Sequence, residues 1–286
     1  MRKLLYFAAV FFSITVYKFE GFGEVRKVGG TWQNEILNKY SEHKESDSYF
    51  KKCNFLAGKL GEVDTDCVKH EGGGVIWGDS HAAAISMGIR EVFPEIALNQ
   101  LTTSGCRISF EYKSMPTFRE EQCYASNGYA MKVILDKQPE LVIVAQEKLH
   151  SKVDFLQLFG FMEAAGVQKL IVLGPVPQWR PSLPLAVAKS GGKIRFLEST
   201  FLDQTILEEN EIASAMVEEL RLGFDLEVVY VDLIGFFCAQ KSDSYEHIRC
   251  NIWADFEESE LIIFDYGHLT LQGSILVSDR ILRAVI

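Results

Sequence analysis

The chain has 286 residues, of which 48% are hydrophobic and 24% are charged, with 22 glycines and 7 prolines. These values are ordinary for a globular protein and exclude a collagen-like, low-complexity or disordered chain. A formal net charge of -10 argues against nucleic acid as a partner, because proteins that bind the phosphate backbone need a basic surface. The length predicts one large domain, with or without a short appendage, that buries a sizeable core.

The amino terminus combines basic residues with a short apolar run. Arg2 and Lys3 precede an apolar segment from Leu4 to Tyr17, which is shorter than the roughly 20 residues that span a bilayer. Residues 1–22 therefore indicate a signal peptide, a short membrane anchor or the end of a longer membrane region, and the alternative is a buried first helix. Each membrane interpretation places the rest of the chain outside the cytoplasm, because the positive end stays inside.

The six cysteines fall in three pairs that are close in sequence: Cys53 with Cys67, Cys106 with Cys123, and Cys238 with Cys250. Many pairings are possible in principle, but pairing of neighbours closes three short loops, each of which restricts the unfolded chain by ~3 kcal/mol. A zinc site is disfavoured because there is no Cys-x-x-Cys and no histidine at ligand spacing. We expect disulfides, no metal, and an oxidising compartment.

Residues 23–52 are polar and charged, which predicts a linker before a domain that spans residues 53–286. Within this domain, short apolar runs alternate with amphipathic stretches. Strands are predicted at residues 75–77, 96–101, 141–145, 169–173, 227–233 and 261–264, and helices at residues 81–92, 124–137, 152–165, about 195–222 and 270–284. This alternation is typical of βαβ units, so we predict an α/β fold with a central parallel sheet. In such sheets the ligand site lies at the carboxyl ends of strands, just after each apolar run.

A serine follows the first apolar run of the domain. Gly78, Asp79 and Ser80 predict a tight strand-to-helix turn with Ser80 at its apex. A serine in such a turn points its hydroxyl out of the sheet, beside helix N-terminal amides that stabilise negative charge. The alternative is that Ser80 only caps the helix.

The last apolar run is followed by Asp265, Tyr266, Gly267 and His268. Asp265 and His268 stand three residues apart on one loop, so the carboxylate can orient the imidazole while the second ring nitrogen faces Ser80. Serine needs such a base because its free hydroxyl is a weak nucleophile at neutral pH. The alternative is that Asp265 caps a helix and His268 is an ordinary loop histidine.

Together the two segments resemble SGNH (GDSL-like) hydrolases, and most closely the SGNH domain fused to membrane acyltransferase-3 proteins, which O-acetylate bacterial surface polysaccharides. The residues 77–82 (Trp-Gly-Asp-Ser-His-Ala) and 265–270 (Asp-Tyr-Gly-His-Leu-Thr) match the blocks that open and close that domain, and the resemblance covers roughly residues 53–286. It implies a three-layer, flavodoxin-like α/β/α sandwich. It also implies that Ser80 is the nucleophile, His268 the general base and Asp265 the residue that orients His268, with no cofactor.

The resemblance further implies an oxyanion hole made by the amide of Ser80, a glycine of the second block and an asparagine of the third. Gly105 is the matching glycine. The third block departs from the family pattern, because Gln146 and Glu147 stand where Gly-x-Asn-Asp is expected. Gln146 offers an amide donor in place of the asparagine, whereas Glu147 opposes an oxyanion, and the alternative is that Gln146 is a surface loop residue. Loss of one such donor costs ~3 kcal/mol in the transition state.

The sequence therefore predicts serine-dependent transfer of an O-acyl group, most simply acetyl, to a bacterial cell-surface polysaccharide such as a lipopolysaccharide. A surface glycan is the expected acceptor, and a membrane acyltransferase component is the expected source of the acyl group. A carbohydrate acetyl esterase and a non-catalytic glycan-binding module are the alternatives. Trp179 and Arg180, which follow a predicted strand, are further candidates for the lining of a sugar-binding cleft.

Overall fold

The computed structural model describes residues 30–41, 52–55, 65–111, 114–191, 194–239, 248–255 and 257–286. The signal or anchor segment predicted at residues 1–22 lies outside the described residues. Among the helices inside these ranges, none has the length and apolar character needed to cross a bilayer.

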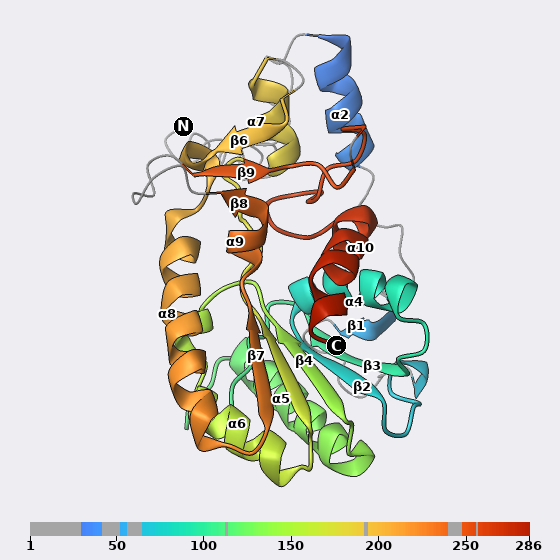
Figure 1. Cartoon of the computed structure of the whole chain (residues 1–286), viewed down its shortest axis with the longest axis vertical. Coiled ribbons are helices and arrows are strands. Elements are labelled where there is room, and N and C mark those ends of the chain that lie inside the picture. Colours follow the sequence, from blue (N-terminus) through green and yellow to red (C-terminus); the bar gives the residue numbers. More distant parts are fainter. Residues whose placement is uncertain are drawn as a thin grey trace, which may run out of the picture.

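A six-stranded parallel sheet forms the centre of the fold (Figure 1). The strands lie in the order β1 (Asn54–Phe55), β3 (Leu98–Thr103), β2 (Gly74–Gly78), β4 (Leu141–Ala145), β5 (Lys169–Leu173) and β7 (Glu227–Val231). The chain builds outward from β2 in both directions, so the strand order reverses between β2 and β4. Ligand sites of open α/β sheets lie at the carboxyl ends of the strands at this point. The predicted α/β fold with a central parallel sheet is confirmed.

Alternating side chains of each strand face two helical layers, as Trp77 and Ile76 do in β2. One face packs against α5 (Phe118–Lys137), α6 (Phe155–Ala164) and the second half of α8 (Gln204–Leu220). The other face packs against α4 (Ser80–Val92) and α10 (Leu271–Arg280). Because both faces are covered, the strands are buried and appear in the sequence as continuous apolar runs. The result is the expected three-layer α/β/α sandwich.

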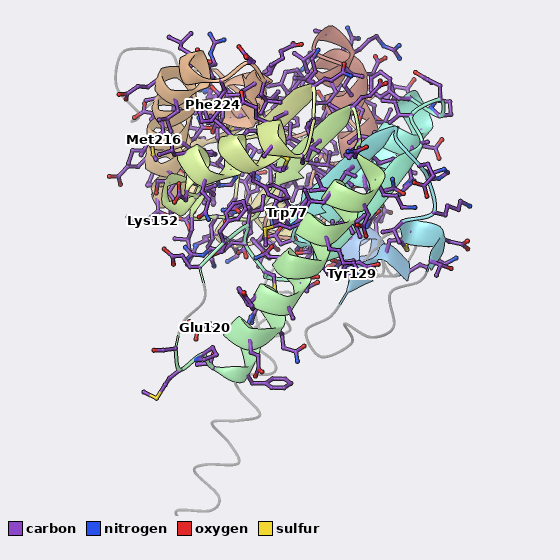
Figure 2. The ribbon with its side chains drawn as sticks, turned by 90° about the horizontal axis from the view of Figure 1, so that it is seen from below. Trp77, Glu120, Tyr129, Lys152, Met216 and Phe224 are labelled. Atoms are coloured by element: carbon purple, nitrogen blue, oxygen red, sulfur yellow. A yellow bond between two sulfur atoms is a disulfide. The ribbon has the colours of Figure 1, made fainter. Side chains whose placement is uncertain are left out.

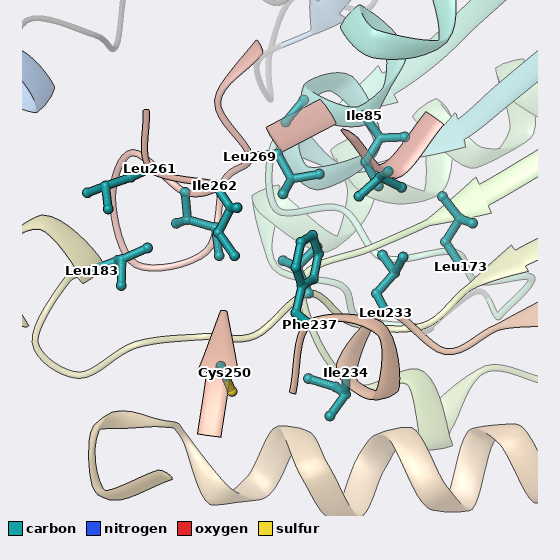
Figure 3. Close-up of a cluster of buried hydrophobic side chains, with 14 of the residues drawn as sticks. Ile85, Leu173, Leu183, Leu233, Ile234, Phe237, Cys250, Leu261, Ile262 and Leu269 are labelled. Atoms are coloured by element: carbon teal, nitrogen blue, oxygen red, sulfur yellow. The ribbon is translucent and has the colours of Figure 1, made fainter. Parts of the chain in front are cut away.

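A small antiparallel sheet lies beyond the carboxyl end of β7 (Figure 1). The chain reaches it through α9 (Leu233–Phe237), and its strands are β6 (Phe196–Glu198), β9 (Arg249–Asn251) and β8 (Cys238–Ala239). Helices α7 (Leu183–Lys189) and α2 (Thr31–Ser41) lie at the same end of the molecule. Figure 3 shows the core there, where Leu183, Leu261 and Ile262 lie near Phe237 and Leu269. Short 3-10 helices complete the described elements: η2 (Thr65–Cys67), η3 (His150–Lys152), η4 (Ser199–Phe201), η5 (Arg221–Gly223) and η7 (Leu282–Ala284).

Two predicted elements are wrong. Residues 261–264 are buried but join neither sheet, because Ile263 bridges only Leu269 and Leu261 bridges only Trp253. The helix predicted from residue 195 starts later, because residues 196–198 pair with β9 and Asp203 caps α8.

Two other segments differ from the prediction in their extent. The polar segment predicted as a linker contains α2, whose Ile36 and Tyr40 are buried in the core, and the N–H of Leu261 donates to the Tyr40 hydroxyl at 2.6 Å. Helix α5 begins six residues before residue 124, at Phe118, because Thr117 and Glu120 form a capping box.

All six cysteines form disulfides with the predicted pairing: Cys53–Cys67, Cys106–Cys123 and Cys238–Cys250. The Cys106–Cys123 disulfide joins the loop after β3 to α5, and the Cys238–Cys250 disulfide joins the adjacent strands β8 and β9. These crosslinks hold segments at the carboxyl ends of the strands, where the candidate site lies.

Candidate active site

Ser80 is the first residue of α4 and stands directly after β2. The turn requires Gly78, because an added Cβ would lie 1.7 Å from the carbonyl oxygen of Ala145 in the neighbouring strand β4. Asp79 is the N-cap of α4, and its Oδ1 accepts the N–H of His81 at 2.8 Å. The alternative that Ser80 only caps the helix is therefore wrong, and its hydroxyl is available at the N-terminus of α4.

His268 and Asp265 complete a hydrogen-bonded chain that starts at Ser80. His268 Nε2 lies 2.8 Å from Ser80 Oγ, and His268 Nδ1 lies 2.8 Å from Asp265 Oδ2. A carboxylate only accepts, so Nδ1 carries the hydrogen and the bare Nε2 can take the proton of Ser80. The N-cap of α10 is Thr270 and not Asp265, which leaves the Asp265 carboxylate for His268.

The Asp265 carboxylate is held by several donors. Its Oδ1 accepts the N–H groups of Gly267 at 3.0 Å and His268 at 2.9 Å. Burial raises the pKa of Asp265, but the hydrogen bonds and the charge of His268 outweigh it and leave the pKa below its ordinary value. Asp265 is therefore ionised at neutral pH and can stabilise an imidazolium at His268.

Three rings pack around His268. Phe264 stacks on it at a centroid distance of 5.7 Å, Tyr266 meets it edge-on at 5.4 Å, and His81 lies 4.4 Å away. Burial, with a smaller contribution from the charge of His268, holds the pKa of His81 well below its usual range. His81 is therefore a neutral ring that packs beside the candidate base.

Asp79 joins the ends of β2 and β4. Its Oδ2 accepts the N–H of Glu147 at 2.7 Å, in addition to the contact of Oδ1 with His81. Burial raises the pKa of Asp79 to about 6, although the two backbone hydrogen bonds oppose this change. Both carboxyl oxygens are used by backbone donors, so Asp79 holds the loop geometry around Ser80.

Gly105 and Gln146 lie on loops that flank the end of β2, because Gly78 pairs with Thr102 on one side and Ala145 on the other. Gly105 has a left-handed φ of 67°, a conformation that glycine adopts at little cost. Gln146 is only 3% exposed, so the alternative that it is a surface residue is wrong. Its Oε1 accepts the N–H of Ile108 at 3.1 Å and its Nε2 donates to the Lys148 carbonyl at 2.8 Å. One hydrogen of this amide is thus in use, and the role of both residues toward an oxyanion stays a prediction.

Residues 52–283 match the family model of the SGNH domain that is fused to AT3 domains. The chain belongs to this family. Its structure is also similar to the periplasmic domain of a lipopolysaccharide acetyltransferase from Salmonella ser. Paratyphi A, with a TM-score of 0.67 and 18% identity over 87% of this chain and 96% of that domain. At this identity the likeness shows a shared fold. No curated protein matches the sequence.

The loop after β5 supports the site of this SGNH domain, and its Trp179 does not line a sugar cleft as predicted. The side chain of Arg180 is exposed, so its place in such a cleft stays a prediction. Trp179 is only 1% exposed, and its backbone N–H donates to the Tyr266 carbonyl at 2.8 Å. Leu183 donates to the Asp265 carbonyl at 2.8 Å, and Arg180 forms an ion pair with Asp203 at 2.8 Å. The prediction for Trp179 is wrong, because its ring fills the core beneath the loop that carries Asp265 and His268.

Sequence reasoning missed the contact between α4 and α10 that brings Ser80 to His268. Gly88 and Ser274 are small residues on these helices, and an added Cβ at Gly88 would lie 2.2 Å from the backbone carbon of Ser274. Gly273 in α10 is close to a different segment, because a Cβ there would lie 2.2 Å from the carbonyl oxygen of Ile262. Small residues on two predicted helices are the signal in the sequence, but they indicate that the helices approach closely only once it is known that the two helices are partners. No group of three or more His, Cys, Asp or Glu in the described part of the SGNH domain is placed to hold a metal ion.

Proposed function

We propose that this SGNH domain transfers an O-acyl group, most simply acetyl, to a hydroxyl of a bacterial cell-surface polysaccharide outside the cytoplasm. The chain of hydrogen bonds from Ser80 through His268 to Asp265 carries this proposal. Membership of a family fused to AT3 domains supports acyl transfer over other serine chemistry. The similar domain of a lipopolysaccharide acetyltransferase supports a lipopolysaccharide as the class of acceptor.

In the first half of the reaction, Ser80 Oγ attacks the acyl carbonyl while its proton passes to His268 Nε2. The backbone amides of Ser80 and Gly105 and the side-chain amide of Gln146 stabilise the oxyanion that forms. The intermediate then collapses, the leaving group of the donor takes the proton from His268, and an acyl ester remains on Ser80.

In the second half, a sugar hydroxyl attacks the acyl ester and gives its proton to His268. Collapse returns that proton to Ser80 Oγ and releases the acylated sugar. Water in place of the sugar gives hydrolysis, so an esterase uses the same residues and is the second candidate function. The available hydroxyl of Ser80 favours both of these over a non-catalytic glycan-binding module.

The proposed reaction requires a donor on the same side of the membrane. We infer that a membrane acyltransferase component delivers the acyl group, because the related domains are fused to AT3 domains. Three disulfides support the periplasm or another extracytoplasmic compartment. A signal peptide or anchor at residues 1–22 would provide export and stays a prediction.

The test measures acyl release from a chromogenic acetyl ester by the oxidised full-length chain, with and without lipopolysaccharide-derived glycans, and follows acetylated sugar by mass spectrometry. Ser80→Ala removes the proposed nucleophile, and Ser214→Ala in α8 is the matched control. The transferase is supported if acetyl release depends on Ser80 and if added glycan turns the released acetyl into acetylated sugar. Release to water alone favours the esterase, and glycan binding without release or acetyl adduct favours the binding module.

A further inference from the structure

A cavity of about 220 Å³ opens between the loop that follows β3 and the first turns of α5. Gly105, Arg107, Arg119 and Tyr124 contribute to its lining. The Cys106–Cys123 disulfide joins its two walls. In Figure 2, α5 lies in front of Trp77, and its first turn near Glu120 extends beyond the other elements of the domain. The cavity is therefore bounded by a crosslinked loop and a projecting helix.

Neither arginine of this cavity forms an ion pair within the described parts of the chain. Arg107 is half-buried, and no ion pair or hydrogen bond of its guanidinium occurs within these parts. Arg119 makes one long hydrogen bond, from Nη2 to the Gly105 carbonyl at 3.4 Å. The nearby Glu120 carboxylate is used elsewhere, because it accepts the N–H of Thr117 at 2.8 Å and its hydroxyl at 2.9 Å. Glu111, on the same lining, forms no ion pair with either arginine in these parts of the chain.

The backbone that carries Arg107 is fixed on both sides. Cys106 is tied to α5 by its disulfide, and the N–H of Ile108 donates to Gln146 Oε1 at 3.1 Å. The carbonyl of Arg107 itself accepts from Nδ2 of Asn127 at 3.0 Å, and the buried Asn127 also accepts from Trp77 Nε1 at 3.1 Å. Loop, sheet and helix thus fix the backbone of Arg107 before any ligand binds, which reduces the entropy cost of binding.

The cavity lies at the same edge of the sheet as Ser80. Gly105 follows β3, the strand that pairs with β2, and Ser80 follows β2. Gly105 is also one of the residues predicted to stabilise the oxyanion. A polysaccharide whose hydroxyl reaches Ser80 can therefore extend into the cavity with a neighbouring sugar.

We propose that this cavity binds an anionic group of the acceptor polysaccharide, a carboxylate or phosphate on a sugar near the one acylated, through Arg107 and Arg119. The inference rests on the proposed function, and it names the substrate class as an acidic glycan. The planar guanidinium fork matches carboxylate and phosphate oxygens in two-point contacts. A chain with a net charge of -10 repels anions at long range. Two arginines of one cavity that form no ion pair within the described residues provide the local attraction that such a ligand needs.

The experiment measures binding in the Ser80→Ala background of the oxidised full-length chain, so that no turnover occurs. The probes are an oligosaccharide with one glucuronic acid, its carboxyl-reduced neutral form, and the neutral form carrying a phosphate monoester. We expect an acidic form to bind at least tenfold more tightly than the neutral form. The comparison of the two acidic forms distinguishes a carboxylate site from a phosphate site.

Arg107→Gln and Arg119→Gln should each remove most of this preference without changing the affinity for the neutral form. Arg107→Lys keeps the positive charge but loses the two-point contact of the guanidinium, so it should retain part of the preference for the acidic forms. The matched control is Arg221→Gln in η5, before the amino end of β7 and therefore away from the carboxyl ends of the strands. It should leave the affinities for the neutral, carboxylate and phosphate forms unchanged. Thermal unfolding of each variant checks that it is folded.

Equal affinity for the acidic and neutral forms, no binding of either acidic form, or a preference that survives Arg107→Gln would each overturn the inference. Failure of the proposed function is a different result. In that case the acidic preference is present, but the wild-type chain forms neither acyl-Ser80 nor an acetylated sugar in the assay above.

Discussion

The N–H of Gly88 in α4 donates to Oγ of Ser274 in α10 at 2.7 Å, and the same hydroxyl donates to the Ile85 carbonyl at 2.8 Å. These bonds require a very close approach of the two helices, because a Cβ added to Gly88 would lie 2.2 Å from the backbone carbon of Ser274. Ser80 begins α4, and His268 stands just before α10. The contact between the helices therefore positions the candidate nucleophile Ser80 against the candidate base His268, although this contact lies two helical turns from Ser80.

Gly88→Ala should push α4 away from α10 and lower ester hydrolysis by about 10²-fold, since a displacement of ~1 Å between reacting groups costs that much. Overpacking should also destabilise the protein by ~1–3 kcal/mol. The control is Gly128→Ala in α5, where an added Cβ meets no atom within 4 Å. It should keep the activity and stabilise the helix by up to ~1 kcal/mol. Thermal unfolding and ester hydrolysis measure both effects, and wild-type activity in Gly88→Ala would contradict the positioning role.

Asp265→Asn should abolish most of the activity while leaving the fold intact. The asparagine oxygen can still accept the N–H groups of Gly267 and His268, but its amide would face His268 Nδ1 as a donor. That contact favours the tautomer with the hydrogen on Nε2, which cannot take a proton from Ser80. We expect kcat to fall by about 10³–10⁴-fold. The control is Asp154→Asn at the N-cap of α6, which replaces one good cap with another and should retain full activity.

The residues of the site were easier to predict than the structures that support them. Ser80, Asp265 and His268 each follow an apolar run, and the two end motifs made their meeting predictable. The run at residues 261–264 is not a strand, because a buried loop and a buried strand have the same apolar composition. Trp179 follows a strand like a ligand-binding aromatic, but only the fold shows that its ring is buried.

Segments with a strong local signal were predicted well, and those that depend on distant partners were not. The disulfide pairing followed from short loops between neighbouring cysteines. Helix α2 was missed because only a few of its side chains, among them Ile36 and Tyr40, are buried, and the segments that α2 contacts, α7 and the loop at Leu261, come much later in the chain. Tertiary packing, and not local propensity, decides such elements.

Gly105→Ala tests whether this loop contributes to the reaction. Gly105 and Gly166 have similar left-handed φ angles of 67° and 79°, so alanine at either should cost ~1–2 kcal/mol of stability. At Gly105 the new Cβ also meets Arg119 Nη2, whereas at Gly166 it meets nothing within 4 Å. We expect Gly105→Ala to lower kcat for the acetyl ester at least tenfold and Gly166→Ala to leave kcat unchanged. Alanine keeps the backbone N–H of this residue and can only displace it, so equal kcat values for the two variants would argue against a dependence of the reaction on the position of this loop.

His150 should make the domain sensitive to acid. The ring is 1% exposed in a pocket lined by apolar side chains that include Val144, Phe155 and Val172, and burial lowers its pKa to about 3. In the unfolded chain the pKa is near 6.5, so between pH 6.5 and 3 only the unfolded state binds this proton. Stability is therefore complete above pH 6.5 and is lost as the pH falls, by about 1.4 kcal/mol per pH unit.

His150→Leu keeps an apolar side chain in this pocket and removes the proton, so its loss of stability with falling pH should be shallower than that of the wild type by about 1.4 kcal/mol per unit. Urea unfolding at pH 6.5, 5.5 and 4.5 measures the two slopes. Some slope remains in the variant, because burial also lowers the pKa of His81. The control is His70→Leu, since the ring of His70 is less buried and its pKa is lowered less. Parallel curves for wild type and His150→Leu would mean that His150 is protonated in the folded state, and its burial among apolar side chains would have to be relieved by a rearrangement of η3.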